Sequence, residues 1–563
     1  MTDTATPSTT AWWRHAAIYQ IYVRSFADGD GDGTGDLAGV RDRLPYLRRL
    51  GVDALWFTPW YTSPMADGGY DVADYRDIDP RFGTLADAES LIAEAHTHGL
   101  RVLIDLVPNH CSDQHPWFRR ALSDGPGSPA RDRFWFVPGR GPDGELPPND
   151  WQSYFGGPAW TRITEADGTP GPWYLHMFAP EQPDLNWEHP DVRAEFESIL
   201  RFWLDRGVDG FRIDVAHGLM KKPGLPDAGP HPDPTDLPYQ DCDDVHEIYR
   251  DWRKILDSYD GDRTFVGEVW LPTPDQFARY LRPDELHSAF NFEFLCCAWE
   301  AGALRDVIAG TLAAHRPVGA PPTWVLSNHD TIRHVTRYGR ADTSFDMGDK
   351  RLSDPSDPVL GRRRARAAAL MSMALPGGVY VYQGDELGLP EVRNIPDALI
   401  QDPTFRRSRG ADRGRDGCRV PLPWTAGGPS LGFSPDGAPG DPWLPQPAAW
   451  VALSVEAQTG DPDSFLTLYR EALALRRERL AGLPETLSPV PGAGPDTVCF
   501  DRPGGFRCLA NLGADPVAVP AGARVLLSSG PLPGDTGGRW LPADTCVWLD
   551  LGEAGPGAGT PAA

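Results

Sequence analysis

Residues 18–59, which read IYQIYVRSFADGDGDGTGDLAGVRDRLPYLRRLGVDALWFTP, decide the fold of this chain. The apolar runs 18–23 and 53–59 are typical of buried strands, and residues 36–51 between them have the apolar spacing of an amphipathic helix. Strands that alternate with helices are typical of units whose strands lie parallel. This stretch therefore predicts a parallel sheet covered by helices.

The same alternation continues along the chain. Helical periodicity returns at 84–99 and 190–207, and further strand candidates occupy residues 101–107, 209–215, 264–270, 288–294, 322–328 and 378–384. Together with the first two, these make eight strands. The sequence predicts an α/β fold, a (β/α)₈ TIM barrel, in which active sites lie at the carboxyl ends of the strands.

Two segments do not continue this pattern. Residues 111–185 are rich in Gly, Pro and Trp and lack helical periodicity, which predicts a small inserted domain after the third strand. From 484 onward only short β-like runs occur, which predicts a C-terminal antiparallel β-sandwich with a disordered tail. The expected domains are the barrel at 1–110 and 186–483, the inserted subdomain at 111–185 and the C-terminal domain at 484–563.

Composition excludes several classes of partner. The 563 residues carry a formal net charge of −26, whereas nucleic acids and anionic membranes attract positive surfaces. The eight Cys residues are scattered, as expected of reduced thiols. The first residues resemble no secretory signal, and no apolar run is long enough to span a membrane. We expect a cytoplasmic monomer or homodimer that acts on a small neutral molecule.

Carboxylates stand at the ends of several predicted strands. Arg212 and Asp214 share one face of the fourth strand, so the guanidinium should lower the pKa of Asp214 and keep it ionised, as a nucleophile requires. Glu268 ends the fifth strand between Val and Trp, surroundings that favour the protonated form of a proton donor. Asp330 ends the seventh strand and Asp105 the third. A nucleophilic and a protonated carboxyl side by side are characteristic of glycoside hydrolysis.

Five short segments appear in a characteristic order: DLVPNH (105–110), QPDLN (182–186), GFRIDVAH (210–217), GEVW (267–270) and VLSNHD (325–330). With them the chain resembles the alpha-amylase superfamily, glycoside hydrolase family 13, over nearly its full length. The resemblance implies Asp214 as nucleophile, Glu268 as general acid/base and Asp330 as transition-state stabiliser. It also implies that His110, Arg212 and His329 hold the sugar, and that the reaction retains the α-anomer.

QPDLN, DGDGDGTGD (28–36), GGYDVADY (68–75) and RDGCRVPLPW (415–424) are similar to the alpha-glucosidase and oligo-1,6-glucosidase branch. This similarity implies that Asp71 pairs with Arg419 across the end of the pocket and grips the terminal glucose. A pocket closed in this way accepts only chain ends. The similarity also implies that Tyr70 stacks on the bound ring, while Phe155 either lines the pocket or belongs to the core of the insert.

The expected activity is that of a retaining, exo-acting alpha-glucosidase that releases glucose from maltose and short malto-oligosaccharides. In this branch a Val after the nucleophile accompanies α-1,6 activity, so Val215 keeps an oligo-1,6-glucosidase open as the alternative. An alpha-transglucosylase, a trehalose-forming isomerase and a sucrose-active enzyme share the same intermediate and also stay open. A non-catalytic scaffold is disfavoured because the three acids are intact.

The loop DGDGDGTGD begins like a calcium loop, with oxygen-bearing side chains at alternate positions and Gly33 at the sharp turn. It does not end like one, because Gly39 stands where an EF-hand has Glu. The family resemblance implies a structural Ca²⁺ or Mg²⁺, and no organic cofactor. Its expected ligands are Asp28, Asp30, Asp32, the Thr34 carbonyl and Asp36; a bare acidic turn is the alternative.

Overall fold

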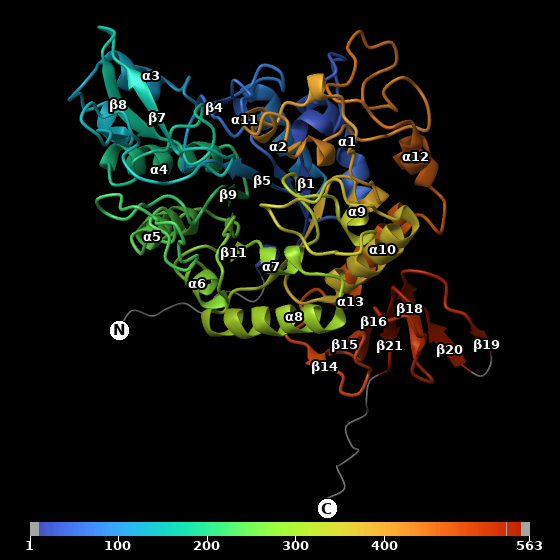
Figure 1. Cartoon of the computed structure of the whole chain (residues 1–563). Helices are drawn as coiled ribbons and strands as arrows, with labels where there is room; N and C mark the ends of the chain where they lie inside the picture. Colours follow the sequence, from blue (N-terminus) through green and yellow to red (C-terminus); the bar gives the residue numbers. More distant parts are fainter. Residues whose placement is uncertain (1–10, 536–537, 553–563) are drawn as a thin grey trace, which may run out of the picture.

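The computed structural model describes residues 11–535 and 538–552 (Figure 1). Its centre is a parallel sheet of eight strands in the spatial order β11-β10-β9-β5-β2-β1-β13-β12. No ladder joins β11 to β12 within the described residues, so the barrel is nearly closed. The strands are β1 (Ala17–Ile21), β2 (Ala54–Phe57), β5 (Arg101–Leu106), β9 (Gly210–Ile213), β10 (Thr264–Gly267), β11 (Ser288–Ala289), β12 (Thr323–Val325) and β13 (Gly378–Tyr382). The predicted barrel fold is confirmed.

Helices alternate with these strands, as the apolar periodicity predicted. Their ends follow local chemistry: Asp36 caps the first turn of α1, and Gly51, at φ 95°, ends it in the left-handed conformation. The helices are α1 (Leu37–Leu50), α2 (Leu85–Thr97), α4 (Pro190–Leu204), α5 (Val245–Asp257), α6 (Pro274–Arg279), α8 (Ala301–His315), α9 (His334–Tyr338), α10 (Pro358–Ala374), α11 (Pro403–Arg407), α12 (Val455–Gln458) and α13 (Phe465–Arg479).

The sixth strand is much shorter than its apolar run predicted. A strand over 288–294 is wrong beyond Ala289, because the chain turns there into the short helix α7 (Phe292–Cys296). The reason is local: the side chain of Asn291 accepts the Phe294 N–H at 2.9 Å and so caps a helix. This early turn brings Phe292 next to the end of β10, where its ring stacks on Trp270.

A hairpin that the sequence did not predict follows β2. Its strands are β3 (Tyr61–Thr62) and β4 (Asp74–Ile78), joined by residues 63–73. Asp79 helps to hold the start of this loop by accepting the Ser63 N–H at 2.9 Å. The loop carries Asp67, Tyr70 and Asp71. It turns back between the first two of these through Gly68 and Gly69, which both lie in the left-handed region.

The insert after β5 contains a small antiparallel sheet in the order β6-β8-β7, with β6 (Phe136–Val137), β7 (Trp160–Thr164) and β8 (Pro170–Leu175). A separate apolar cluster around Trp151, Trp160 and Met177 lies beneath it. The insert also contains α3 (Pro116–Ser123), which its composition did not indicate. Figure 1 shows this part and the C-terminal sheets far from one another, with the barrel between them.

The C-terminal part consists of two antiparallel sheets, as predicted. Leu541 of the smaller sheet packs with Leu509 and Val547 of the larger one. The larger sheet has the order β14-β15-β16-β21-β18 and the smaller β17-β20-β19; the strands are β14 (Ser488–Pro489), β15 (Thr497–Arg502), β16 (Phe506–Asn511), β17 (Val517–Ala518), β18 (Arg524–Ser528), β19 (Gly534–Asp535), β20 (Gly538–Leu541) and β21 (Thr545–Asp550).

Two further expectations concern the whole chain. All eight Cys residues are free in this structure, in agreement with reduced thiols. None of the helices in the described ranges is both long enough and apolar enough to cross a membrane. The tail that the sequence predicts to be disordered, after residue 551, falls almost entirely outside the described residues.

Candidate active site

Arg212 joins three carboxylates at the carboxyl end of the barrel. It lies opposite Asp105 in the ladder between β5 and β9, and its Nη1 is 2.7 Å from Asp105 Oδ1. The same Nη1 contacts Asp214, and Nη2 lies 2.8 Å from Glu268 Oε2. The side chains of Arg212 and Asp105 are 1% and 0% exposed, whereas those of Asp214 and Glu268 keep 7% and 13%. The inner pair is therefore closed to solvent, whereas the outer two acids keep some exposure.

The charge balance of this cluster differs from the expectation. Burial raises the pKa of Asp214 well above its ordinary range; Arg212 opposes the shift, and the charges of Glu268 and Asp105 add to it. Arg212 does lower the pKa of Asp214, as expected, but burial outweighs it, so the expected net lowering is wrong. Burial likewise raises the pKa of Asp105 to about 6. Protonation of Glu268 removes one of the repulsive charges, so a proton held there favours an ionised Asp214.

Glu268 follows β10 and is held from the chain segment beside the nucleophile. Its Oε2 accepts the Val215 N–H at 3.0 Å, and its backbone oxygen accepts the Ala216 N–H at 2.9 Å. Val215 has a φ of 45°, which is rare for a β-branched residue, and Gly218 N donates to Val215 O across the turn. This strained turn fixes the positions of Asp214 and Glu268 relative to one another.

Asp330 lies just after β12 between two guanidinium groups. Arg415 Nη1 and Arg419 Nη2 lie 3.0 and 2.9 Å from its Oδ1. Burial opposes ionisation of Asp330, but His329, at 3.2 Å, and these arginines together hold its pKa well below the usual range. Because burial lowers the pKa of His329 well below its ordinary value, the arginines supply the positive charge beside Asp330 at neutral pH. Asp330 is thus a permanent anion whose side chain keeps 16% exposure at the site.

The predicted aromatic and histidine residues also gather here. Tyr70 stacks on His329 with ring centroids 5.3 Å apart, and its hydroxyl lies 2.6 Å from His329 Nε2 and 3.1 Å from Asp105 Oδ2. Burial lowers the pKa of His110 to about 4, and its Nε2 lies 3.1 Å from the Tyr70 carbonyl. Phe155 packs against the guanidinium of Arg415 at 4.9 Å. Phe155 also packs against Phe178 of the insert, with ring centroids 5.5 Å apart, so both alternatives for this residue stay open.

The predicted pair of Asp71 with Arg419 is not formed. The Asp71 carboxylate accepts the backbone N–H groups of Ala66 and Asp67 at 2.8 and 3.0 Å, and burial raises its pKa to about 6. The acid of this loop that does pair with an arginine is Asp67, whose carboxylate contacts Arg415. The sequence reasoning missed Asp67 because it lies on the unpredicted hairpin loop. Its place directly before two glycines was the available signal.

Two further ion pairs escaped the sequence reasoning. Asp402, fully buried, pairs with Arg415 Nε at 2.6 Å, so Arg415 contacts three carboxylates, as Arg212 does. Lys221, also buried, lies 2.9 Å from Asp184 of the QPDLN segment. A charged residue in an irregular loop gives no periodic signal, so neither of these two ion pairs could be predicted from the sequence.

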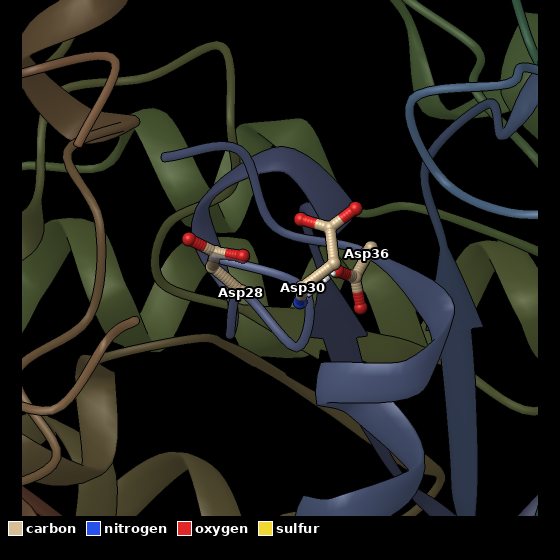
Figure 2. A group of neighbouring side chains, drawn as sticks. All are labelled: Asp28, Asp30 and Asp36. Carbon is tan, nitrogen blue, oxygen red and sulfur yellow. Dashed lines mark hydrogen bonds between the residues drawn. The ribbon is translucent and has the colours of Figure 1, made fainter. Parts of the chain in front are cut away.

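The acidic loop before α1 brings three of its carboxylates together (Figure 2). Oxygens of Asp28, Asp30 and Asp36 lie within 4.8 Å of one another. Burial, together with the neighbouring acids, raises the pKa of Asp30 and of Asp36. Asp32 lies outside this group and accepts the Thr34 N–H at 2.7 Å. The oxygen donors and their mutual repulsion fit a hard divalent cation such as Ca²⁺ or Mg²⁺.

Comparisons with known proteins agree with this geometry. The family model described as "Alpha amylase, catalytic domain" matches residues 20–482, and one described as a domain of unknown function (DUF3459) matches 493–548. A probable alpha-glucosidase of Rhizobium meliloti is 39% identical over 496 residues, which cover 83% of this chain and 82% of that protein. An oligo-1,6-glucosidase of Saccharomyces cerevisiae is 36% identical, with 83% and 84% covered. The crystal structure of an alpha-glucosyl transfer enzyme superposes with a TM-score of 0.83 at 36% identity, over 97% of this chain and all of the other.

Replacing Arg212 by Met should destabilise the fold in a pH-dependent way. The change leaves Asp105 buried without its counter-charge, which costs about 3–5 kcal/mol of unfolding free energy. A carboxyl whose pKa is raised in the folded state stabilises the fold at low pH, and this contribution is lost as pH rises through about 6. Denaturant unfolding should therefore show that Arg212→Met loses much more unfolding free energy, relative to wild type, at pH 8 than at pH 5. Arg49→Met, at an exposed arginine, is the control. An equal loss of unfolding free energy at both pH values for Arg212→Met would contradict the role of Arg212 as the counter-charge of Asp105.

Proposed function

The chain belongs to the alpha-amylase family, glycoside hydrolase family 13, and from this premise we propose that it is a retaining, exo-acting alpha-glucosidase. The single observation that carries the proposal is the cluster of Asp214 and Glu268 on two arms of one guanidinium. Two carboxyls held that closely favour the retaining reaction, since an inverting enzyme needs room for a water molecule between them.

In the proposed reaction Asp214 attacks the anomeric carbon while Glu268 protonates the departing glycosidic oxygen. The resulting glycosyl-enzyme is opened by water, from which Glu268 takes a proton. Asp330, held as a permanent anion by its two arginines, stabilises the positive charge that develops on the sugar ring. Burial keeps His110 and His329 neutral, so neither adds a charge beside the sugar.

The proposed preference for chain ends rests on the ion pairs around Arg415. This side chain contacts Asp67, Asp330 and Asp402 at once, and we propose that the cluster occupies the position beyond the first sugar. From the same excursion after β13, Arg407 Nε donates to Gly156 O of the insert at 2.9 Å. We propose that these groups close one end of the site, which would admit a substrate only by its terminal residue.

We propose maltose and short malto-oligosaccharides as substrates. The alternatives are α-1,6-linked glucosides and transfer of glucose to another sugar. The first alternative is supported by Val215 and by the similarity to an oligo-1,6-glucosidase, and the second by the similarity to an alpha-glucosyl transfer enzyme. All three share one glycosyl-enzyme and differ in the group that reaches it.

We further propose that Asp28, Asp30 and Asp36 hold a Ca²⁺ or Mg²⁺ with a structural role. The three carboxylates also accept loop N–H groups, and Asp36 caps α1, so they are held in place before any ion binds. A bound divalent cation would offset their repulsion and brace the turn between β1 and α1. It brings no acid or base to the sugar, because the proposed chemistry lies with Asp214 and Glu268.

One substrate panel tests the proposed function. Wild-type protein incubated with maltose, maltotriose, isomaltose, sucrose and trehalose should release glucose fastest from the first two, with the α-anomer formed initially. Asp214→Asn should lower the rate by at least about a thousandfold without lowering the melting temperature. Chromatography and NMR follow the products. Dominant transfer products, or full activity of the Asp214→Asn variant, would overturn the hydrolase proposal.

Asp67→Ala should weaken the grip on the terminal glucose. Arg415 would then lose one of its three anions and its fixed orientation, so KM for maltose should rise about ten- to hundredfold. The kcat value should change less. Asp77→Ala, an exposed acid on β4 of the same hairpin, serves as the matched control. Identical KM values for the Asp67→Ala variant and wild type would refute the proposed pocket end.

Chelation should reveal the metal. Purified protein should contain about one equivalent of Ca²⁺ or Mg²⁺, and EDTA should lower its melting temperature by several degrees, because an ion bound only to the folded state stabilises it. Asp30→Asn should abolish the EDTA effect, whereas Asp32→Asn should largely preserve it, since Asp32 lies outside the three-carboxylate group. Metal-free protein with no EDTA response would rule the site out.

A further inference from the structure

The two oxygens of Glu268 have different hydrogen-bond donors. Oε2 receives two, the Arg212 guanidinium at 2.8 Å and the Val215 N–H at 3.0 Å. Oε1 receives one, the indole Nε1–H of Trp270 at 3.1 Å. A carboxyl oxygen that already accepts two donors, one of them charged, is a poor place for a proton. The proton of the acid form therefore resides on Oε1.

We propose that Trp270 is a positioning residue that directs this proton toward the glycosidic oxygen, an inference that rests on the function proposed above. An indole N–H donates and never accepts, so it occupies one lone-pair direction of Oε1 without competing for the proton. The remaining direction of Oε1 is the one left for the proton. Trp270 thereby sets the orientation of the acid while Arg212 and Val215 anchor its other oxygen.

The indole itself is held by a specific contact. Its ring stacks on Phe292 with centroids 3.7 Å apart and an interplanar angle of 8°. A cavity of about 290 Å³, lined by Phe277 and His315 among others, adjoins both rings. The stack and the hydrogen bond to Glu268 therefore orient the indole, which also packs against the core cluster that contains Phe292. The early end of β11 matters here, because it turns Phe292 into position.

The proton balance of the reaction follows from this arrangement. In the first step the Oε1 proton passes to the glycosidic oxygen as the bond from that oxygen to the anomeric carbon breaks and Asp214 bonds to the carbon. Glu268 is then an anion, and the Trp270 N–H donates to it more strongly than to the acid. In the second step a water oxygen bonds to the anomeric carbon as the bond from that carbon to Asp214 breaks, and Oε1 takes the proton of the water. Asp214 is then free as a carboxylate and Glu268 is again the acid, which restores the starting state.

Trp270→Phe removes the donor and keeps a ring for the stack. Because the N–H favours the ionised form, its loss should move the alkaline limb of kcat/KM for maltose upward by about half a pH unit or more. Activity on maltose should fall about tenfold, and on 4-nitrophenyl α-glucoside less than about threefold, since that leaving group departs without a proton. Trp270→Leu should show the same two changes and guards against a folding defect in one variant.

Trp299→Phe is the matched control, because its indole Nε1 donates to a carboxylate at 2.8 Å, that of Asp544, in the C-terminal part. It should leave both the pH profile and the ratio of the two substrates unchanged. An unshifted alkaline limb in Trp270→Phe, with equal losses on both substrates, would overturn the role of Trp270 alone. A wild type inactive on both glucosides would overturn the proposed function and this inference with it.

Discussion

The guanidinium of Arg212 is the interaction on which the site depends. It is almost fully buried and contacts Asp105, Asp214 and Glu268, which come from the ends of three neighbouring strands. Without a counter-charge, carboxylates this deep would be protonated or would disrupt the barrel rim. With one shared guanidinium they stay together but remain short of positive charge. Burial and that deficit raise the pKa of Asp214, which favours a proton in the cluster, as the proposed reaction requires.

A second shared guanidinium organises the opposite side of the site. Arg415 contacts Asp67 on the hairpin loop, Asp330 after β12 and Asp402 after β13. Three segments far apart in sequence are therefore tied at one point. The electrostatic balance differs between the two sides. Around Arg212 the acids outnumber the base, and burial raises the pKa of Asp214. On the other side Arg415 and Arg419 help to hold the pKa of Asp330 low. One side of the site thus retains a proton and the other a fixed negative charge.

Much of the fold could be predicted from the sequence, because apolar periodicity reports burial directly. All eight barrel strands begin within a residue of their predicted starts, and six keep more than half of the predicted length. The seventh is shortened to residues 323–325, and the sixth ends early where Asn291 caps a helix instead. Acids at strand ends could be predicted as well, since strand direction alone places them at one rim. The hairpin of β3 and β4 could not, because its strands are short and its loop lacks periodicity. The error of choosing Asp71 over Asp67 followed from that omission.

By itself, the sequence determined the barrel, the order of its strands and the identity of the acids at its rim, because these depend on local patterns of apolar and charged residues. Only the tertiary structure decided how the charges are shared: which acids Arg212 and Arg415 contact, that burial outweighs Arg212 at Asp214, and that Trp270 reaches Glu268. The physical reason is that solvation and Coulomb energies depend on distances between residues remote in the chain. A linear pattern does not contain those distances, and the packing of strands, loops and insert sets them.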